Sequence, residues 1–217
     1  MRKLAVNTFI SLDGVMQAPG GPDEDPTSGF PHGGWSFHYW DDVMDQVMGE
    51  AMAAPYDLLL GRRTYEIFAA HWPNATDAPP AASLNAAHKY VASRTLQHAA
   101  WGPATLIRDV PAEVAKLKAQ DGVEIQVHGS SDLLQTLLRH NLVDELRVWT
   151  FPVLLGGGKR LFGDGIAPGG LKLVGSTVST SGVIIATYQR AGAIRYGSFA
   201  LEEPTPAAVE RREQLRS

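Results

Sequence analysis

A glycine followed by two arginines and a threonine is the part of this chain whose residue types most clearly suggest chemistry. The run Gly61-Arg62-Arg63-Thr64 separates a short apolar stretch from a segment with helical spacing. Free backbone N–H groups and the positive end of a helix dipole make such a turn a phosphate site, and arginine adds two-pronged phosphate binding. The pattern predicts a site for phosphate or a phosphorylated nucleotide cofactor. A plain turn with two solvated arginines is the alternative.

Two later turns carry similar residues. Ser93 and Arg94 follow a strand-like segment and suit the 2′-phosphate of an adenosine ribose, although a plain turn has the same composition. Gly129, Ser130 and Ser131 follow another such segment and suit a pyrophosphate, with serine capping of the next helix as the alternative. Because right-handed crossovers bring such turns to one sheet edge, we expect all three to lie together.

Aspartates and aromatic residues form a second group of candidates. Asp13 ends the first strand-like segment, and we expect the long glycine- and proline-rich loop 17–34 to act as a lid. Asp41 and Asp45 lie within 37–53, which helical spacing predicts to be one helix. Asp41 falls on its apolar face, which predicts a raised pKa and an acid. The catalytic candidates are Asp13, Asp41 and Asp45. The substrate-side candidates are Asn7, Phe9, Trp35, Trp40 and Phe151. For Trp35 and Trp40, which belong to an aromatic group with helical spacing, core packing is the alternative.

Bulk composition excludes several classes of protein. The chain has 217 residues, 44% of them hydrophobic and 19% charged, which predicts one globular domain. A net charge of −4 lacks the basic excess of a nucleic-acid-binding surface. With no cysteine and only scattered histidines, no metal site is predicted. Neither a signal-peptide pattern nor a membrane-length apolar run is present, so we expect a cytoplasmic protein without membrane contact.

Strand and helix patterns alternate early in the chain, and strands dominate near its end. This order predicts an α/β fold with a mostly parallel sheet, helices on both faces and an antiparallel C-terminal hairpin. Residues 73–87, rich in proline and alanine, are expected to form a loop. We predict a single domain over 1–192 and a C-terminal extension over 193–217 with a short helix. The expected strands are 3–10, 56–60, 89–93, 105–107, 124–128, 144–152, 171–178 and 182–190.

Four ordered motifs resemble those of a known family. They are S-L-D-G at 11–14, G-R-R-T-Y-E at 61–66, the glycine-containing turn within 127–134, and V-D-E-L at 143–146 with P-V-L-L-G-G-G at 152–158. Over about residues 3–190 the chain resembles the dihydrofolate-reductase-like superfamily. It is most similar to the RibD C-terminal reductase domain of riboflavin biosynthesis and its stand-alone relatives.

The resemblance implies a three-layer αβα fold, NADPH as cofactor and hydride transfer to a small heterocyclic or carbonyl substrate, in a homodimer. A non-catalytic nucleotide- or flavin-binding module on the same fold is the alternative. The chain departs from the folate enzymes in having Gly129-Ser130 where they have Gly-Gly, and neither Asp41 nor Asp45 lies in a clear folate motif. The residues that the resemblance assigns to the cofactor are Gly61, Arg62, Arg63, Thr64, Ser93, Arg94, Gly129, Ser130 and Ser131.

Overall fold

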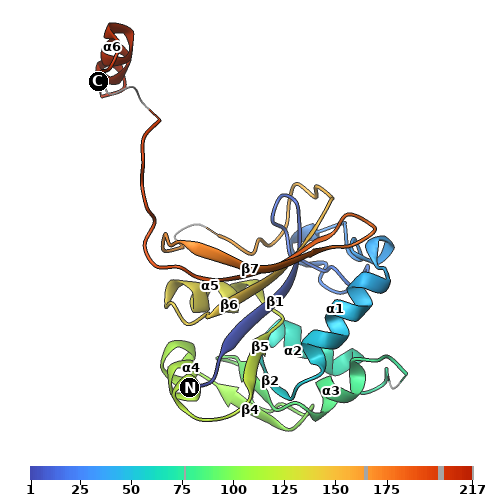
Figure 1. Ribbon diagram of the computed structural model, residues 1–217. Coiled ribbons are helices and arrows are strands. Elements are labelled where there is room, and N and C mark those ends of the chain that lie inside the picture. The colour runs from blue at the N-terminus through green and yellow to red at the C-terminus, as the bar shows by residue number, and fades with distance from the viewer. Residues whose placement is uncertain (76, 164–165, 200–202, 217) are drawn as a thin grey trace.

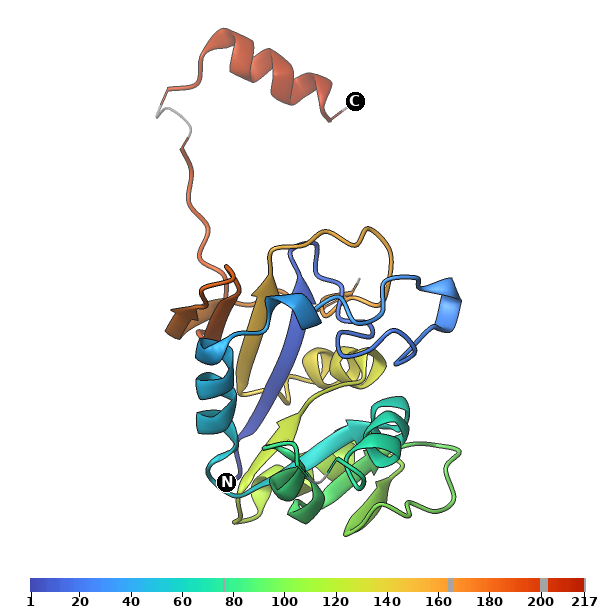
Figure 2. The same ribbon diagram turned by 90° about the vertical axis from the view of Figure 1, so that its right-hand side faces the viewer.

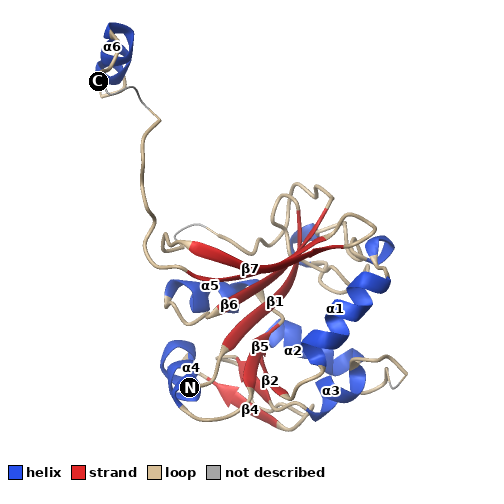
Figure 3. Ribbon diagram, viewed as in Figure 1, coloured by secondary structure: helices blue, strands red, loops and turns tan. Residues whose placement is uncertain are grey.

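The computed structural model describes residues 1–75, 77–163, 166–199 and 203–216, in which eight strands form one sheet (Figure 3). The strand order is β4-β3-β2-β5-β1-β6-β8-β7. All neighbours from β4 to β6 run parallel, and β8 and β7 are antiparallel. The predicted α/β fold is confirmed. The strands are β1 Leu4–Ser11, β2 Tyr56–Gly61, β3 Lys89–Ala92, β4 Ala104–Ile107, β5 Glu124–Val127, β6 Glu145–Phe151, β7 Leu171–Val178 and β8 Ile184–Arg190.

Helices cover both faces of the sheet, because successive strand residues point to opposite sides (Figure 1). Leu58 and Leu60 of β2 pack with Tyr65 of α2, whereas Leu59 packs with Leu134 of α5. Strand register places α1, α2 and α3 on one face and α4 and α5 on the other. The helices of the body are α1 Asp42–Met52, α2 Arg62–His71, α3 Ala81–Ala86, α4 Val110–Ala119 and α5 Ser131–Arg139.

Two predicted elements differ from the structure. The helix expected over 37–53 begins only at Asp42, because Asp41 is extended and its side chain caps the helix by accepting the Met44 N–H. Residues 37–39 form a separate 3-10 turn. The loop expected over 73–87 contains α3, which begins directly after Pro80. Proline disrupts helix interiors but is tolerated at their starts, and alanine is the best helix former.

The C-terminal segment leaves the body after β8 and ends in α6, Pro206–Gln214, away from the sheet in both views (Figures 1 and 2). As the sequence predicts, Thr205 is the N-cap, its Oγ1 accepting the Ala208 N–H at 3.3 Å, and Pro206 lies in the first turn. Throughout the described residues, no helix is both long enough and apolar enough to cross a membrane.

Candidate active site

A cavity of about 1800 Å³ lies along the carboxyl ends of the parallel strands. All three turns singled out in the sequence contribute to its wall, so the expectation that they lie together is confirmed. What they bind stays a prediction. The candidate cofactor residues lining the cavity are Gly61, Arg62, Arg63, Thr64, Ser93, Arg94, Gly129, Ser130 and Ser131.

Two of these turns touch each other through glycines. The Gly61 N–H donates to the Gly129 carbonyl oxygen at 3.1 Å. A Cβ atom on Gly61 would lie 2.0 Å from the Ser130 Oγ, and one on Gly129 would lie 2.7 Å from the Thr64 Oγ1. Ser130 is the N-cap of α5 by position, but its side chain makes no capping hydrogen bond. Side-chain capping therefore does not explain Ser130, and close approach explains both glycines.

The arginines of the predicted site differ in how they are used. Arg62 donates from Nε to Glu66 at 2.7 Å and from Nη1 to the Thr95 hydroxyl at 2.8 Å. Arg63 donates to the Thr27 hydroxyl at 3.0 Å. Arg94 has no hydrogen bond or ion pair with any other described residue. An unpaired guanidinium in a cavity wall is available to bind an anion.

Two further cations line the cavity and were not predicted from the sequence, Arg108 and Lys159. Arg108 donates from Nη1 to the Ser93 carbonyl oxygen and from Nη2 to that of Leu96 at 2.6 Å. It directly follows β4, much as Arg94 follows the strand before, so its position was a usable signal. Lys159 comes from the loop after β6, and no sequence pattern indicated it. We call the part of the cavity formed by residues 61–64, 93–94 and 129–131 together with Arg108 the cationic half.

The long loop after β1 is tied to the cationic half. Asp25 forms an ion pair with Lys159, and the Thr27 hydroxyl accepts hydrogen bonds from Lys159 at 2.9 Å and from Arg63. Burial favours a raised pKa for Asp25, but its bonds with Lys159 and Thr27 outweigh burial and lower the pKa. The loop predicted to act as a lid therefore contacts the Gly61–Thr64 turn directly.

The other part of the cavity has an aromatic wall. The Trp40 and Trp149 rings are stacked with centroids 5.9 Å apart, and Phe9 lies 5.2 Å from Trp149. Trp35 and Phe151, also expected on the substrate side, do not line the cavity. Phe151 is fully buried, and Trp35 packs edge-on against it. Burial of large apolar rings outweighs any preference for a ligand here, so core packing is the correct interpretation for this pair.

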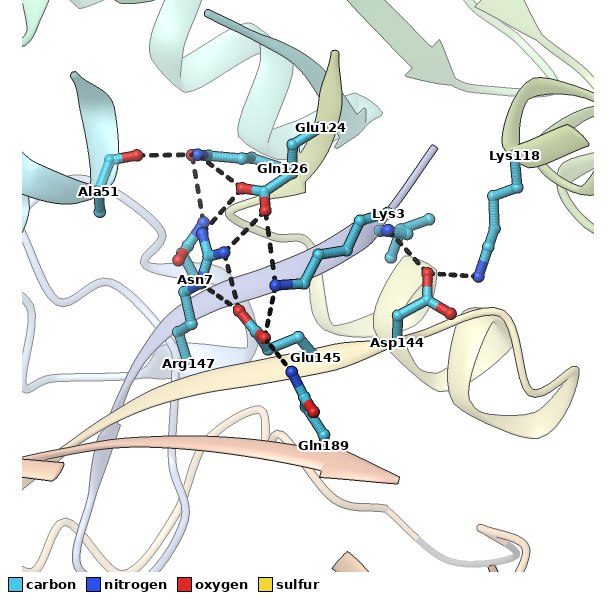
Figure 4. Close-up of polar contacts among 11 residues, drawn as sticks. Lys3, Asn7, Ala51, Lys118, Glu124, Gln126, Asp144, Glu145, Arg147 and Gln189 are labelled. Carbon is cyan, nitrogen blue, oxygen red and sulfur yellow. Dashed lines mark hydrogen bonds and ion pairs between the residues drawn. The ribbon is translucent and has the colours of Figure 1, made fainter. Parts of the chain in front are cut away.

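A polar floor lies beside this wall (Figure 4). The buried Gln126 accepts a hydrogen bond from Asn7 at 3.2 Å, contacts His128 Nε2 at 3.2 Å and donates to the Ala51 carbonyl oxygen at 3.0 Å. These side chains are on the sheet face that carries α1 and α2. We call the part of the cavity formed by Phe9, Trp40, Trp149, Asn7, Gln126 and His128, together with Gly49 of the adjoining helix α1, the aromatic half.

Charged residues lie beside this floor on the same face of the sheet (Figure 4). Arg147 donates to both carboxylate oxygens of Glu124, at 2.8 and 2.7 Å, and to Glu145 at 2.8 Å. Burial, and after it the charge of Arg147, lowers the pKa of His128 to about 4, while Glu124 opposes this shift. His128 is therefore neutral near pH ~7 and serves as a hydrogen-bonding group, not as a proton donor.

The three catalytic candidates are separated by the structure. The Asp13 carboxylate accepts hydrogen bonds from the Ser11 hydroxyl at 2.5 Å and from the Leu155 and Gly156 N–H groups, which lower its pKa to about 2. It does not line the cavity but joins two loops. Only Asp45 lines the cavity, where its Oδ1 accepts the Trp40 Nε1–H at 2.7 Å.

Asp41 is a structural residue. Its carboxylate accepts hydrogen bonds from the Thr180 hydroxyl at 2.7 Å, the Met44 N–H at 3.0 Å and the Ser181 N–H at 3.2 Å. The bond from Thr180 is the main reason that the pKa of Asp41 is lowered to about 2. The raised pKa expected from helix spacing is therefore wrong, because the residue caps the helix and does not lie on its apolar face.

Comparison with known proteins identifies the family. The sequence model of the RibD C-terminal domain matches residues 2–185. The chain belongs to that family. The protein YyaP of Bacillus subtilis strain 168 is 30% identical over 196 residues, which cover 86% of this chain and 94% of YyaP. Among the described residues, no group of three histidine or acidic side chains is placed to hold a metal ion.

Solved structures share the fold of this RibD C-terminal domain protein. A riboflavin biosynthesis protein from Shewanella sp. PV-4 has a TM-score of 0.59 at 23% identity, over 88% of this chain and 99% of that one. Dihydrofolate reductase from Enterococcus faecalis, complexed with NADP(H) and a compound designated RAB-propyl, has a TM-score of 0.56 at 16% identity, over 87% of this chain and 96% of that one. A pyrimidine reductase-like protein from Corynebacterium diphtheriae has a TM-score of 0.58 at 14% identity, over 90% of this chain and 93% of that one. Membership in the RibD C-terminal family supports a function of the reductase type, and the solved structures show that the fold is shared.

Proposed function

We propose that the protein is an NADPH-dependent reductase that transfers a hydride to a small heterocyclic or carbonyl substrate. The observation that carries this proposal is the continuity of the cavity, which joins three phosphate-type turns to an aromatic wall. A dinucleotide needs cations and free N–H groups for its phosphates, and its reactive ring needs a dry, flat surface beside the substrate. The two halves of this cavity offer these environments.

The cationic half suits the phosphates of a nicotinamide dinucleotide. Gly61 and Gly129 let two of the turns pack against each other. The α2 and α5 N-termini add positive dipole ends, and Arg94 has no partner among the described residues. Bound there, NADPH would supply a hydride from its nicotinamide C4. The residues that would hold it are Gly61, Arg62, Arg63, Thr64, Ser93, Arg94, Gly129, Ser130 and Ser131.

The aromatic half suits a planar substrate. Phe9, Trp40 and Trp149 would orient a ring and exclude water, while Asn7 would supply a hydrogen bond. Reduction also requires a proton on the substrate oxygen or nitrogen. Of the three predicted acids, Asp45 alone lines the cavity, so we assign this proton to Asp45 or to a water that it orients.

The direct test is NADPH oxidation by purified protein with a panel of pterins, pyrimidines and quinones. We expect turnover with at least one substrate, a lower kcat for Asp45→Asn, and thermal stabilisation by NADPH that Arg94→Met weakens. Absence of stabilisation by either NADPH or NADH would refute the assignment of the cationic half.

A second candidate is a nucleotide- or flavin-binding module without turnover. Two of the three predicted acids are engaged in structural hydrogen bonds, and Asp45 is exposed at the cavity wall, which favours this alternative. Thermal shifts with NADPH, NADH and FMN separate the candidates. Selective stabilisation by FMN, with a yellow colour on purification, would support the flavin module over the reductase.

We also propose a homodimer. The edge strand β7 is exposed along its whole length and carries large apolar residues without cover from any described element, including Leu171, Leu173 and Val178. Natural proteins usually protect such edges. Light scattering coupled to size exclusion should give twice the chain mass, and Leu173→Lys should shift it to the monomer. A monomeric wild type would contradict the proposal.

A further inference from the structure

The turn 93–96, which follows β3 and carries Arg94, is held at both ends by one guanidinium. Arg108 donates from Nη1 to the Ser93 carbonyl oxygen and from Nη2 to the Leu96 carbonyl oxygen at 2.6 Å. A planar fork can bridge two carbonyls in a fixed geometry that the single ammonium of a lysine does not reproduce. Arg108 therefore acts as a clamp across the turn.

The clamp is itself anchored to α4. The Glu113 Oε1 accepts the backbone N–H groups of Arg108 and Asp109, both at 2.8 Å. Asp109 is the N-cap of α4, with its Oδ1 accepting the Ala112 N–H at 3.2 Å. The position of Arg108 is thus fixed by the start of a helix, independently of any ligand.

A second arginine holds the middle of the turn. It follows β2, on the other side of β3 from the strand that Arg108 follows. Arg62 on α2 donates to the Thr95 hydroxyl at 2.8 Å. Within the turn, the Ser93 Oγ accepts the N–H groups of Thr95 at 3.3 Å and Leu96 at 2.9 Å. These bonds occupy the acceptor sites of the Ser93 hydroxyl and leave its proton to donate elsewhere. Ser93 and the unpaired Arg94 both line the cavity.

We propose that Arg108 is a positioning residue for cofactor selectivity. By clamping the 93–96 turn, it holds Arg94 and Ser93 where they bind the 2′-phosphate that distinguishes NADPH from NADH. The inference rests on the proposed function. We assign Arg108 to act through the turn because each of its terminal nitrogens donates to a carbonyl oxygen of that turn. Its other N–H groups remain available, so the test must separate positioning from direct contact with the phosphate.

The test is a double-mutant cycle on the full-length protein, with the dissociation constants of NADP⁺ and NAD⁺ measured by calorimetry. Arg94→Met should weaken NADP⁺ binding ~10- to 100-fold and change NAD⁺ binding less than ~2-fold. Arg108→Met should weaken NADP⁺ binding at least ~10-fold and, like Arg94→Met, change NAD⁺ binding less than ~2-fold. In the Arg94→Met background, Arg108→Met should cost much less selectivity than it does in the wild type, because both changes act on one site and only the contribution of Ser93 is left to lose.

Matched variants separate positioning from general damage. Arg139→Met removes an exposed arginine of α5 that does not line the cavity, and it should leave both constants unchanged. Arg108→Lys keeps the charge without the bridging fork, so it should still lower the NADP⁺/NAD⁺ affinity ratio at least ~3-fold. This variant carries the test if Arg108→Met does not fold, as judged by its melting temperature.

Two outcomes overturn the inference alone. An unchanged affinity ratio in Arg108→Met would show that the clamp is dispensable. Selectivity losses that multiply in the double variant would show that Arg108 contacts the phosphate itself. If wild-type protein binds neither nucleotide, the proposed function fails and this inference fails with it. Loss of selectivity in Arg94→Met but not in Arg108→Met would leave the proposed function intact.

Discussion

The two halves of the cavity are built in different ways. In the cationic half, side chains come from turns directly after strands, so chain order alone brings them to one sheet edge. In the aromatic half, Phe9 and Trp149 lie within strands, and Trp40 lies in a loop before α1. Their meeting depends on strand register and on where α1 begins. Local sequence therefore specifies the first half, whereas tertiary packing specifies the second.

The largest contrast should come from one glycine in each half. Gly61→Ala should abolish measurable NADPH binding and destabilise the fold by about 1–3 kcal/mol, because the new Cβ would lie 2.0 Å from the Ser130 Oγ. Gly49 lines the aromatic half on α1, and an added Cβ there meets nothing within 4 Å. Gly49→Ala should stabilise the helix by about 1 kcal/mol. Calorimetric melting and NADPH titration measure both effects, and equal effects would contradict the contrast.

The next largest effect should come from removing Arg147, which should lower the stability of the fold without lowering NADPH affinity. Arg147→Met leaves the buried Glu145 and its neighbour Glu124 with Lys3 as their remaining cation, which should cost about 3 kcal/mol in urea unfolding. NADPH affinity should change little, because no hydrogen bond or ion pair among the described residues joins Arg147, Glu124 or Glu145 to the cationic half. A parallel loss of NADPH affinity would show that the halves are coupled.

The same variant should respond differently to pH. Burial alone would raise the pKa of Glu145, but hydrogen bonds from Gln189 and Lys3 and the charge of Arg147 lower it. In the wild type this carboxylate stabilises the fold above its unfolded pKa of ~4.3, and that contribution is lost as pH falls through the lower folded pKa. Without Arg147 the folded pKa of Glu145 rises, so the stability gap between the two proteins should shrink as pH falls through their two folded pKa values. A constant gap would contradict this.

The sequence predicted the residues of the cationic half better than those of the aromatic half. It placed all nine candidate residues of the cationic half at the cavity, because a glycine or serine at a strand end has few other positions available. It misjudged Asp41, because helical spacing cannot show where a helix starts, and it misjudged Phe151, because a buried ring and a ligand-contacting ring have the same pattern. It missed Lys159, whose contact with Asp25 spans most of the chain.

A smaller effect should be seen at His128. Burial and the charge of Arg147 lower its pKa to about 4, so its ring signals in NMR should stay unchanged above ~pH 5. The unfolded chain takes up this proton near pH ~6.5, so stability from the neutral ring should decline as pH falls from ~6.5 towards 4. Arg147→Met should shift the titration upward, with His128→Gln used to assign the signal. Titration near its ordinary pKa would contradict a dry aromatic half.

The smallest effect on catalysis should come from the cap of α1. Asp41→Ala removes acceptors for the Met44 N–H and the Thr180 hydroxyl, so the melting temperature should fall. The turnover number per folded molecule should stay near that of the wild type, whereas Asp45→Asn should lower it. If Asp41→Ala lowers kcat as much as Asp45→Asn, Asp41 would return to the list of catalytic candidates.

The stacked tryptophans of the aromatic half give the protein an optical signature of its own. Two indole rings 5.9 Å apart and only 10° from parallel are close enough for their electronic transitions to couple. Where the transition dipoles of the two rings are rotated relative to each other, such a pair contributes a paired positive and negative band to the circular dichroism spectrum. A substrate ring that disturbs the stack would change this band, whereas a nucleotide held only in the cationic half would leave it intact. The chain thus carries a label-free reporter of which half is occupied.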